Sequence, residues 1–310
     1  MSVTAPPGKP VVRMGDRLFA GTARAAALTI MLALAGVFVF LAIEGVPGLS
    51  APEGIYQPAS DFWSYVGPLV FGTILAAVVA LVIAVPFSIG VALYISHYAP
   101  RRIAVPVAYV IDLLAAVPSV VYGLWGGLAL AQALKPTIDW TYEHLSFIPF
   151  FAGPPSVTGR TMLTAGIVLA IMVVPITTAI AREVFAQTPL LHEEAAMALG
   201  ATRWETIRLA VFPYARSGVI SAVMLGLGRA LGETMAVAMV LSATPVVTLN
   251  LISNTNPATI ASNIASNYKE ASPDKQAVLI ATGLVLFAVT FAVNFLARLV
   301  ISRGERNLTR

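Results

Sequence analysis

Long apolar stretches alternate with short polar ones along the chain, and six of the apolar stretches are long enough to cross a membrane as helices. A bilayer core of about 30 Å needs about 20 residues at ~1.5 Å rise per residue. Continuous apolar runs favour helices over barrel strands, which would alternate. The pattern predicts an all-α polytopic membrane protein with six transmembrane helices, at residues 25–43, 67–96, 104–134, 161–182, 216–249 and 276–298.

Composition supports this interpretation. Of 310 residues, 58% are hydrophobic and 11% are charged, and the charged share is about half that of an ordinary soluble domain. The chain has no cysteine, which excludes disulfides and thiolate metal sites.

The positive charges predict an orientation, because Lys and Arg are retained on the cytoplasmic side. With the N-terminus inside, fourteen of them lie in cytoplasmic segments, while the outer loops hold only Lys135, Arg160, Lys269 and Lys275. We therefore expect a multi-pass membrane protein with cytoplasmic tails at 1–24 and 301–310. The first apolar run exceeds a secretory signal core and lacks a cleavage site, so it is interpreted as an anchor.

Two outer loops, 135–160 and 251–275, are either solvated surface or a docking face for an outer partner. The sequence lacks the motifs of an enzyme. The phosphate-binding signature G-x-x-x-x-G-K-[ST] does not occur, and no group of residues could serve together as nucleophile, base and orienting residue. His97, His144 and His192 are far apart and are expected to be surface residues. We expect no catalytic residue, metal site, bound cofactor or nucleic-acid partner.

The connection 183–215 between the fourth and fifth spans carries helix signals. Thr188 before Pro189 predicts a helix whose first amides the threonine hydroxyl caps. Glu193 and Glu194 suit its first turns, where the helix dipole favours negative charge.

A second short helix is predicted immediately afterwards. Gly200 can take the left-handed conformation that ends the first helix. Thr202 and Glu205 form a T-x-x-E capping box, and Pro213 is expected to limit the new helix. The pair either docks a partner or only packs against its own spans.

Arg229 is the most unusual residue of the fifth span. It lies twelve residues beyond Ser217, about 18 Å into a helix at ~1.5 Å per residue, and a charge at this depth must face protein or a water-filled path. Glu233 follows one turn later on the same face. Either the two form a structural pair, or Arg229 is a cationic site for a permeating anion that Glu233 moderates.

The segment E-A-A-x-x-x-G, from Glu194 to Gly200, resembles the coupling loop of type I ABC importer permeases. The resemblance implies that this loop sits in a groove of an ATPase subunit. The family pattern then ends I-x-L-P, and residues 210–213 depart from it mildly. The coupling residues implied by the resemblance are Glu193, Glu194, Ala195, Ala196 and Gly200.

The segment G-L-G-R-A-L-G-E-T-M-A-V, residues 226–237, closely resembles the fifth span of phosphate ABC-transporter permeases. A-A-V-P-S-V-V-Y-G, residues 115–123, resembles their third span, and its proline and glycine would interrupt the helix. The resemblance implies a substrate pathway that includes Arg229, Glu233 and Ser119. Asp112 either pairs with a neighbouring span or belongs with Pro118 to a cytoplasmic gate.

The segments GDRLF and S-D-F-W-x-Y-V-G-P-L-V-F-G-T, the second at 60–73, resemble the C-type permease subunit, with an importer transmembrane domain at 66–300. The resemblance implies a homologous A-type permease, a dimeric ABC ATPase that uses ATP and Mg²⁺, an outer phosphate-binding protein and surrounding lipid. The hypothesis is a permease subunit of an ATP-driven phosphate importer. Its rivals are a sulfate or molybdate permease, an ATPase-independent anion transporter or channel, and a non-transporting scaffold.

Overall fold

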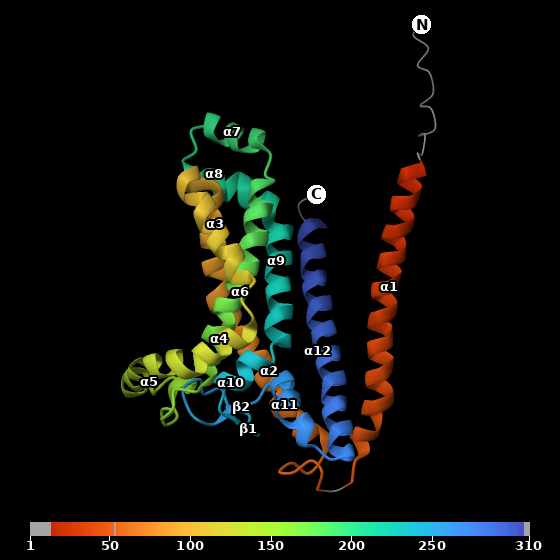
Figure 1. Ribbon diagram of the computed structural model, residues 1–310. Helices are drawn as coiled ribbons and strands as arrows, with labels where there is room; N and C mark the ends of the chain where they lie inside the picture. The colour runs from red at the N-terminus through yellow and green to blue at the C-terminus, as the bar shows by residue number, and fades with distance from the viewer. Residues whose placement is uncertain (1–13, 53, 307–310) are drawn as a thin grey trace.

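The computed structural model describes residues 14–52 and 54–306 and is almost entirely helical (Figure 1). Five long helices run along the molecule: α1 (Met14–Gly45), α2 (Phe62–Leu93), α6 (Met162–Ala186), α9 (Phe212–Gly232) and α12 (Pro273–Arg306).

The shorter helices are α3 (Arg101–Ala115), α4 (Ser119–Trp125), α5 (Ala131–Leu145), α7 (Leu190–Ala198), α8 (Arg203–Thr206), α10 (Met235–Val240) and α11 (Ile260–Asn267). Turns of 3₁₀-helix lie at Val46–Ser50, Pro149–Phe151 and Tyr268–Glu270, and π-helical turns at Tyr94–Tyr98, Gly126–Leu130 and Ile207–Val211. Two short strands, β1 (Ala243–Thr244) and β2 (Asn256–Pro257), pair in parallel.

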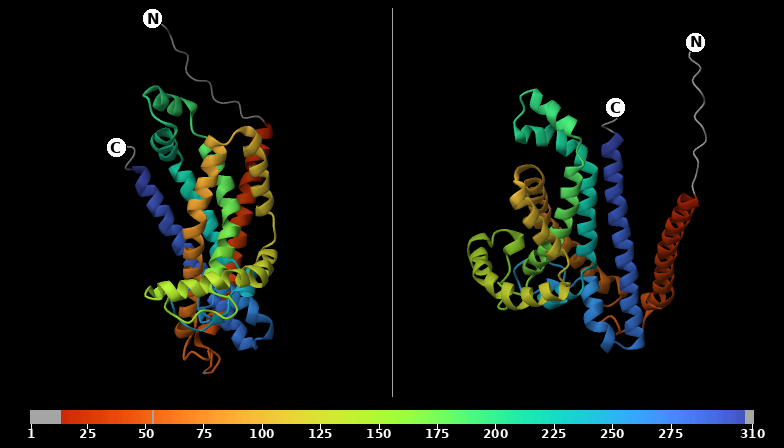
Figure 2. Two further views of the ribbon diagram at one scale, coloured as in Figure 1. Left: turned by 90° about the vertical axis from the view of Figure 1, so that its left-hand side faces the viewer. Right: turned by 45° about the horizontal axis from the view of Figure 1, so that its top comes forward.

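The molecule has two distinct ends (Figures 1 and 2). We call one the terminal side, where α1 starts, α12 ends and α7 and α8 lie. The other is the loop side, where α5, α11 and the turn Val46–Ser50 lie.

Within residues 14–52 and 54–306, five helices are long and apolar enough to cross a membrane, and the number is six if one bent pair of helices is counted as a single span. Residues 104–134, predicted as one span, instead belong to Arg101–Ala115 and Ser119–Leu145, which meet at 91°. The break has a local cause, since Pro118 lacks an N–H and disfavours helical backbone at Val117. The predicted interruption of this span is therefore present.

The fifth predicted span also differs from the structure. Residues 216–249 are not one helix, because α9 ends at Gly232 and the short α10 follows. Beyond Val240 the chain forms β1 and loops.

Small residues let the central helices pack closely. A Cβ atom on Gly166 of α6 would lie 2.3 Å from Cγ1 of Val79 in α2, and one on Gly226 of α9 would lie 2.7 Å from Oγ1 of Thr177 in α6. In membranes such close contacts supply the packing energy that the hydrophobic effect cannot. The α2, α6 and α9 stack therefore fixes the position of α9.

The first helix stands apart from this stack (Figure 1). Its contacts with α12 lie near its loop-side end, where the rings of Phe38 and Phe287 are 5.5 Å apart and Gly45 packs on Ala281. The most apolar 18-residue window of this segment is 0% buried.

The helices also extend into the predicted tails. Residues 14–24 form the first turns of α1, and residues 301–306 belong to α12. The remainder of both predicted tails, 1–13 and 307–310, lies outside the described residues.

Candidate functional site

Arg229 lies near the loop-side end of α9 and lines a cavity of about 880 Å³ that α9 forms with α6 and α12. The cavity is lined by Ile176, Ser221, Met224, Leu225, Gly228, Arg229, Asn294 and Arg298. None of these residues is acidic and two are cationic, so the cavity favours an anion.

The guanidinium of Arg229 is incompletely satisfied by the chain. Its Nε is buried and has no hydrogen-bond partner among the described residues. The ion pairs found among these residues join other groups, His97 with Glu193 and Arg182 with Asp112. A buried donor without an acceptor costs about 1–3 kcal/mol. Arg229 thus lines the cavity with a guanidinium whose hydrogen-bonding capacity the described chain leaves partly unused.

Glu233 does not form an ion pair with Arg229, which corrects the arrangement inferred from helical spacing. α9 ends at Gly232, and Glu233 has extended backbone with ψ of 127°. Its Oε1 accepts a hydrogen bond from the backbone N–H of Ala236 at 3.1 Å. Residues four apart share a face only within one helix, and here the helix ends between them.

The two interrupted spans meet just after their breaks. A Cβ atom on Gly123 of α4 would lie 2.8 Å from Cα of Ala236 in α10, and one on Gly127 would lie 2.7 Å from the carbonyl oxygen of Met239. The glycines let α4 and α10 touch backbone to backbone. The helix that follows the break in the third span, α4, therefore packs against the helix that follows the break in the fifth span, α10.

Ser119 and Pro118 lie at the first of these breaks. Ser119 is half-buried and begins α4, and Pro118 occupies the N-cap position. Tyr122, one turn later, donates its hydroxyl to the carbonyl oxygen of Leu114 at 2.9 Å, which ties α4 to the end of α3. Neither Ser119 nor Pro118 lines the cavity beside Arg229.

Sequence reasoning missed Tyr122, Asn294 and Arg298. Tyr122 belongs to the segment 115–123, but nothing in the sequence showed that its hydroxyl donates across the break to Leu114. Asn294 could have been noticed as the one side-chain amide in the apolar run 277–297. Arg298 was counted only for orientation, as one more cytoplasmic charge.

Asp112 lies on α3, on the terminal-side half of the bent pair. Its Oδ2 is 4.0 Å from Nη2 of Arg182 on α6. Both side chains are partly exposed, at 53% and 26% respectively. An exposed pair of this kind stabilises by about 0–1 kcal/mol, so the contact links α3 to α6 without locking them.

The helix pair on the terminal side follows most of the local predictions. Gly200 has φ of +87°, the left-handed conformation that suits glycine. Thr202 and Glu205 form the predicted capping box: Glu205 Oε2 accepts from the Thr202 backbone N–H at 2.8 Å, and Thr202 Oγ1 accepts from the Glu205 N–H at 3.4 Å.

Two details of that prediction were wrong. Thr188 does not cap α7; Pro189 is at the N-cap, and the Thr188 hydroxyl is buried without a hydrogen bond among the described residues. Pro213 does not limit α8, which runs through the π-helical turn Ile207–Val211 into α9. Because proline has no N–H to donate, it is tolerated in the first turn of α9.

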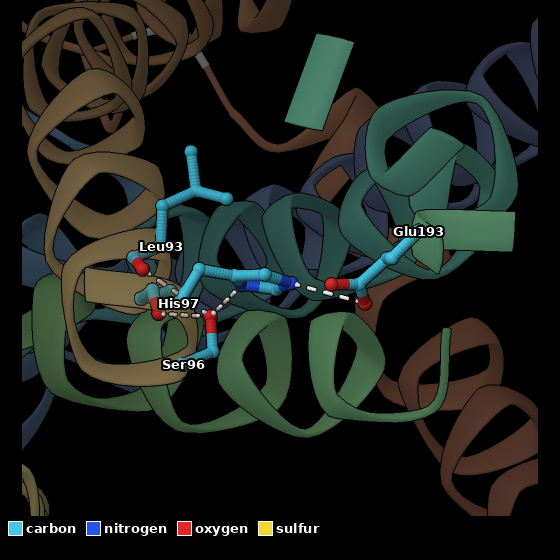
Figure 3. A network of polar contacts seen from close by, with 5 residues as sticks. Leu93, Ser96, His97 and Glu193 are labelled. Atoms are coloured by element: carbon cyan, nitrogen blue, oxygen red, sulfur yellow. Dashed lines mark hydrogen bonds and ion pairs between the residues drawn. The ribbon is translucent and has the colours of Figure 1, made fainter. Parts of the chain in front are cut away.

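Glu193 joins α7 to the end of α2 (Figure 3). Its Oε1 lies 3.6 Å from Nε2 of His97, and Nδ1 of His97 lies 2.7 Å from Oγ of Ser96. The ring of His97 also packs edge-on against Phe185 of α6. His97 therefore contacts both Glu193 of α7 and Phe185 of α6.

The outer surface of α7 is apolar and open. Leu190, Leu191 and Leu199 are 71%, 75% and 90% exposed. Glu194 and Ala195 are exposed as well, and Ala196 is half-buried. Ala195 and Ala196 line a groove of about 460 Å³ with Leu191, His192, Leu209, Ala210, Pro213 and Tyr214. This surface is suited to contact with another protein.

Within residues 14–52 and 54–306, no group of three or more His, Asp or Glu side chains gathers to hold a metal ion.

Comparison with known proteins agrees with this architecture. Residues 84–305 match the family described as binding-protein-dependent transport system inner membrane component. The chain is 44% identical to "Phosphate transport system permease protein PstC 2" of Mycobacterium tuberculosis, over 98% of this chain and 99% of the relative. It is 41% identical to "Phosphate transport system permease protein PstC" of Xylella fastidiosa, over 86% and 82%.

Among solved structures, a chain of a bacterial ABC transporter involved in the import of the acidic polysaccharide alginate superposes with a TM-score of 0.57 at 15% identity. The superposition covers 93% of this chain and 99% of the other. The chain thus has the type I ABC importer permease fold and is a multi-pass membrane protein, and it belongs to the family of binding-protein-dependent transport system inner membrane components.

Proposed function

We propose that this chain is a permease subunit of an ATP-driven phosphate importer. The observation that carries the proposal is Arg229, a half-buried residue whose Nε has no hydrogen-bond partner among the described residues and which lines a cavity without acidic residues. The planar fork of an arginine suits the oxygens of a tetrahedral oxyanion. The names of the relatives support phosphate as the anion.

Both termini are proposed to be cytoplasmic in a bacterial inner membrane. The support is the distribution of Lys and Arg, with fourteen in the segments of one side and four in those of the other. The terminal side then faces the cytoplasm, and the loop side faces the binding protein.

The proposed partners are a homologous A-type permease, a dimeric ABC ATPase and an outer phosphate-binding protein. The unburied α1 offers apolar surface to the second permease or to lipid. ATP and Mg²⁺ are used by the ATPase, and this chain performs no catalysis.

The ATPase is proposed to dock on the helix pair α7–α8. The residues proposed for coupling are Glu193, Glu194, Ala195, Ala196 and Gly200. The exposed leucines of α7 and the adjoining groove suit such a contact. The link from Glu193 to His97 then carries the motion to the spans.

Transport is proposed to occur by alternating access, with the breaks of the third and fifth spans as the moving parts. Ser119 and Glu233 lie at these breaks, and Pro118 with Asp112 forms a cytoplasmic gate. Because a ligand shifts an equilibrium only through differential affinity, phosphate must contact Arg229 more strongly in one state than in the other.

The test is uptake of radiolabelled phosphate by the reconstituted complex carrying Arg229→Gln. We expect loss of uptake by at least about a hundredfold, because the charge that offsets desolvation of the anion is gone. The matched control is Arg216→Gln, an exposed arginine on the same helix. Normal phosphate uptake by Arg229→Gln would refute the assignment.

Two further results would favour the rival functions. If unlabelled sulfate or molybdate inhibited the uptake of labelled phosphate more strongly than unlabelled phosphate does, the substrate would be another oxyanion. If ATP depletion left uptake unchanged, the protein would be a secondary transporter.

A further inference from the structure

The cavity beside Arg229 has a second polar wall, on α12. Asn294 and Arg298 both line it. They are four residues apart, so they lie on one face of α12 and about 6 Å apart along its axis. Both are exposed, and neither takes part in a hydrogen bond or ion pair with the rest of the described chain.

The charges around this wall have one sign. α9 contains no acidic residue along its whole length. α12 contains none between Lys275 and Gly304, and the acidic residue of α6, Glu183, does not line the cavity. The two arginines therefore share a cavity without a neutralising carboxylate, an arrangement that favours a bound anion.

The two arginines lie at different depths. Arg229 is seventeen residues from the terminal-side end of α9, about 26 Å at ~1.5 Å per residue. Arg298 is eight residues from the terminal-side end of α12, about 12 Å by the same rise. Because α9 and α12 run antiparallel and lie side by side (Figures 1 and 2), Arg298 is nearer the terminal side.

An arginine at this depth has a simpler explanation, since a long side chain can extend to the membrane surface and interact with water there. That explanation accounts for Arg298 alone. It does not account for Asn294, an amide one turn deeper on the same face, or for the cavity that both share with Arg229.

We propose that Asn294 and Arg298 form a second oxyanion site, which receives phosphate from Arg229 and releases it on the terminal side. This rests on the proposed function and adds the exit half of the path. A permeating ion needs several sites, each strong enough to be entered and weak enough to be left. Arg298 supplies the attraction, and the neutral Asn294 amide donates a hydrogen bond without adding charge.

The experiment measures phosphate uptake and phosphate-stimulated ATP hydrolysis by the whole complex in sealed proteoliposomes of zwitterionic lipid. Arg298→Gln and Asn294→Ala are compared with the wild type, with Arg298→Lys as the conservative variant. Phe291→Leu, an exposed position of α12 that does not line the cavity, is the matched control. Subunit stoichiometry is measured for each variant.

We expect Arg298→Gln to lower the maximal uptake rate about tenfold, with a smaller change in KM, because exit slows while the deeper site at Arg229 is intact. Asn294→Ala should lower it about threefold, and Arg298→Lys should restore most of the rate. Normal uptake by both variants, alongside loss in Arg229→Gln, would overturn the second site and leave the proposed function standing. Normal uptake by Arg229→Gln would instead overturn the proposed function.

An anionic lipid headgroup offers the same phosphate oxygens. The measurement is therefore repeated in proteoliposomes containing phosphatidylglycerol. A defect of Arg298→Gln that is equal in both lipids supports free phosphate as the ligand. A defect confined to the anionic lipid would overturn the proposal, because Arg298 would then hold a headgroup.

Discussion

The helix pair α7–α8 and the paired breaks at α4 and α10 are both short helices that interrupt the long ones, yet they are held differently. Hydrogen bonds between close neighbours in the sequence hold α7–α8, as in the box formed by Thr202 and Glu205. Contacts between distant segments hold α4 and α10, as where Gly123 meets Ala236.

This difference separates two mechanical tasks. A locally specified element keeps its shape when it moves, so α7–α8 can move as a unit and pass its displacement on through Glu193 and His97. An element specified by its partner changes when the partner moves. A displacement of α10 must therefore alter the break at Pro118, and with it the surroundings of Arg229.

The largest effect is expected from a substitution at Gly123, which tests the mutual packing of α4 and α10. Gly123→Leu places a side chain where a Cβ alone would be 2.8 Å from the backbone of Ala236, and overpacking of this kind costs about 3 kcal/mol. We expect a lower Tm of the purified complex and loss of phosphate uptake. Gly67→Leu on α2 is the control, because nothing lies within 4 Å of a Cβ there. An unchanged Tm in Gly123→Leu would show that α4 and α10 are not mutually dependent.

A smaller and purely local effect is expected at Gly200. Nothing lies within 4 Å of a Cβ at this position, so Gly200→Val suffers only from its left-handed backbone, about 1–2 kcal/mol. We expect weaker retention of the ATPase or uncoupled ATP hydrolysis, with the Tm of the membrane helices nearly unchanged. Gly200→Asn, which tolerates this backbone, should behave like the wild type. Equal defects in both variants would indicate a contact through the glycine surface instead of a backbone requirement.

The smallest effect concerns pH at another local cap. Asp61 caps α2, where Oδ1 accepts from the Ser64 backbone N–H at 2.9 Å. This bond, with one from the Ser64 hydroxyl, holds the pKa of Asp61 below its usual 3.8. The stabilisation is therefore present above pH 3.8 and is lost as the pH falls through the lower folded pKa. Asp61→Asn should remove a slight acid-dependent decrease in Tm, measured by thermal scans between pH 5 and about 3; an identical pH profile would exclude this role.

The predictability of the fold follows the same division. Gly200, the capping box and the interruption at Pro118 could be predicted because each depends on residues within one turn. The cap at Thr188 failed because Pro189 takes that position itself. The end of α9 could not be predicted, because residues 217–249 carry no charge apart from Arg229 and Glu233. The helix breaks where α10 packs on α4.

The sequence alone could predict the cationic residue of the candidate site, but not the residues that surround it. A charge deep in an apolar run identified Arg229 without any structure. The choice of Glu233 as its partner assumed one continuous helix. The α12 wall lies 65 residues or more along the chain from Arg229, and only the packing of α9 beside α12 places Asn294 and Arg298 in the same cavity.

The separation of α1 from the bundle makes this protein responsive to the membrane itself. Since no residue of its most apolar window is buried in the described chain, the tilt of α1 depends on what surrounds it, including the thickness of the bilayer. Any change of tilt moves the segment that contains Gly45 and Gly48, and both glycines pack closely against the first turns of α12. We therefore expect the acyl-chain length of the lipid to influence the position of α12, the helix that carries Asn294 and Arg298.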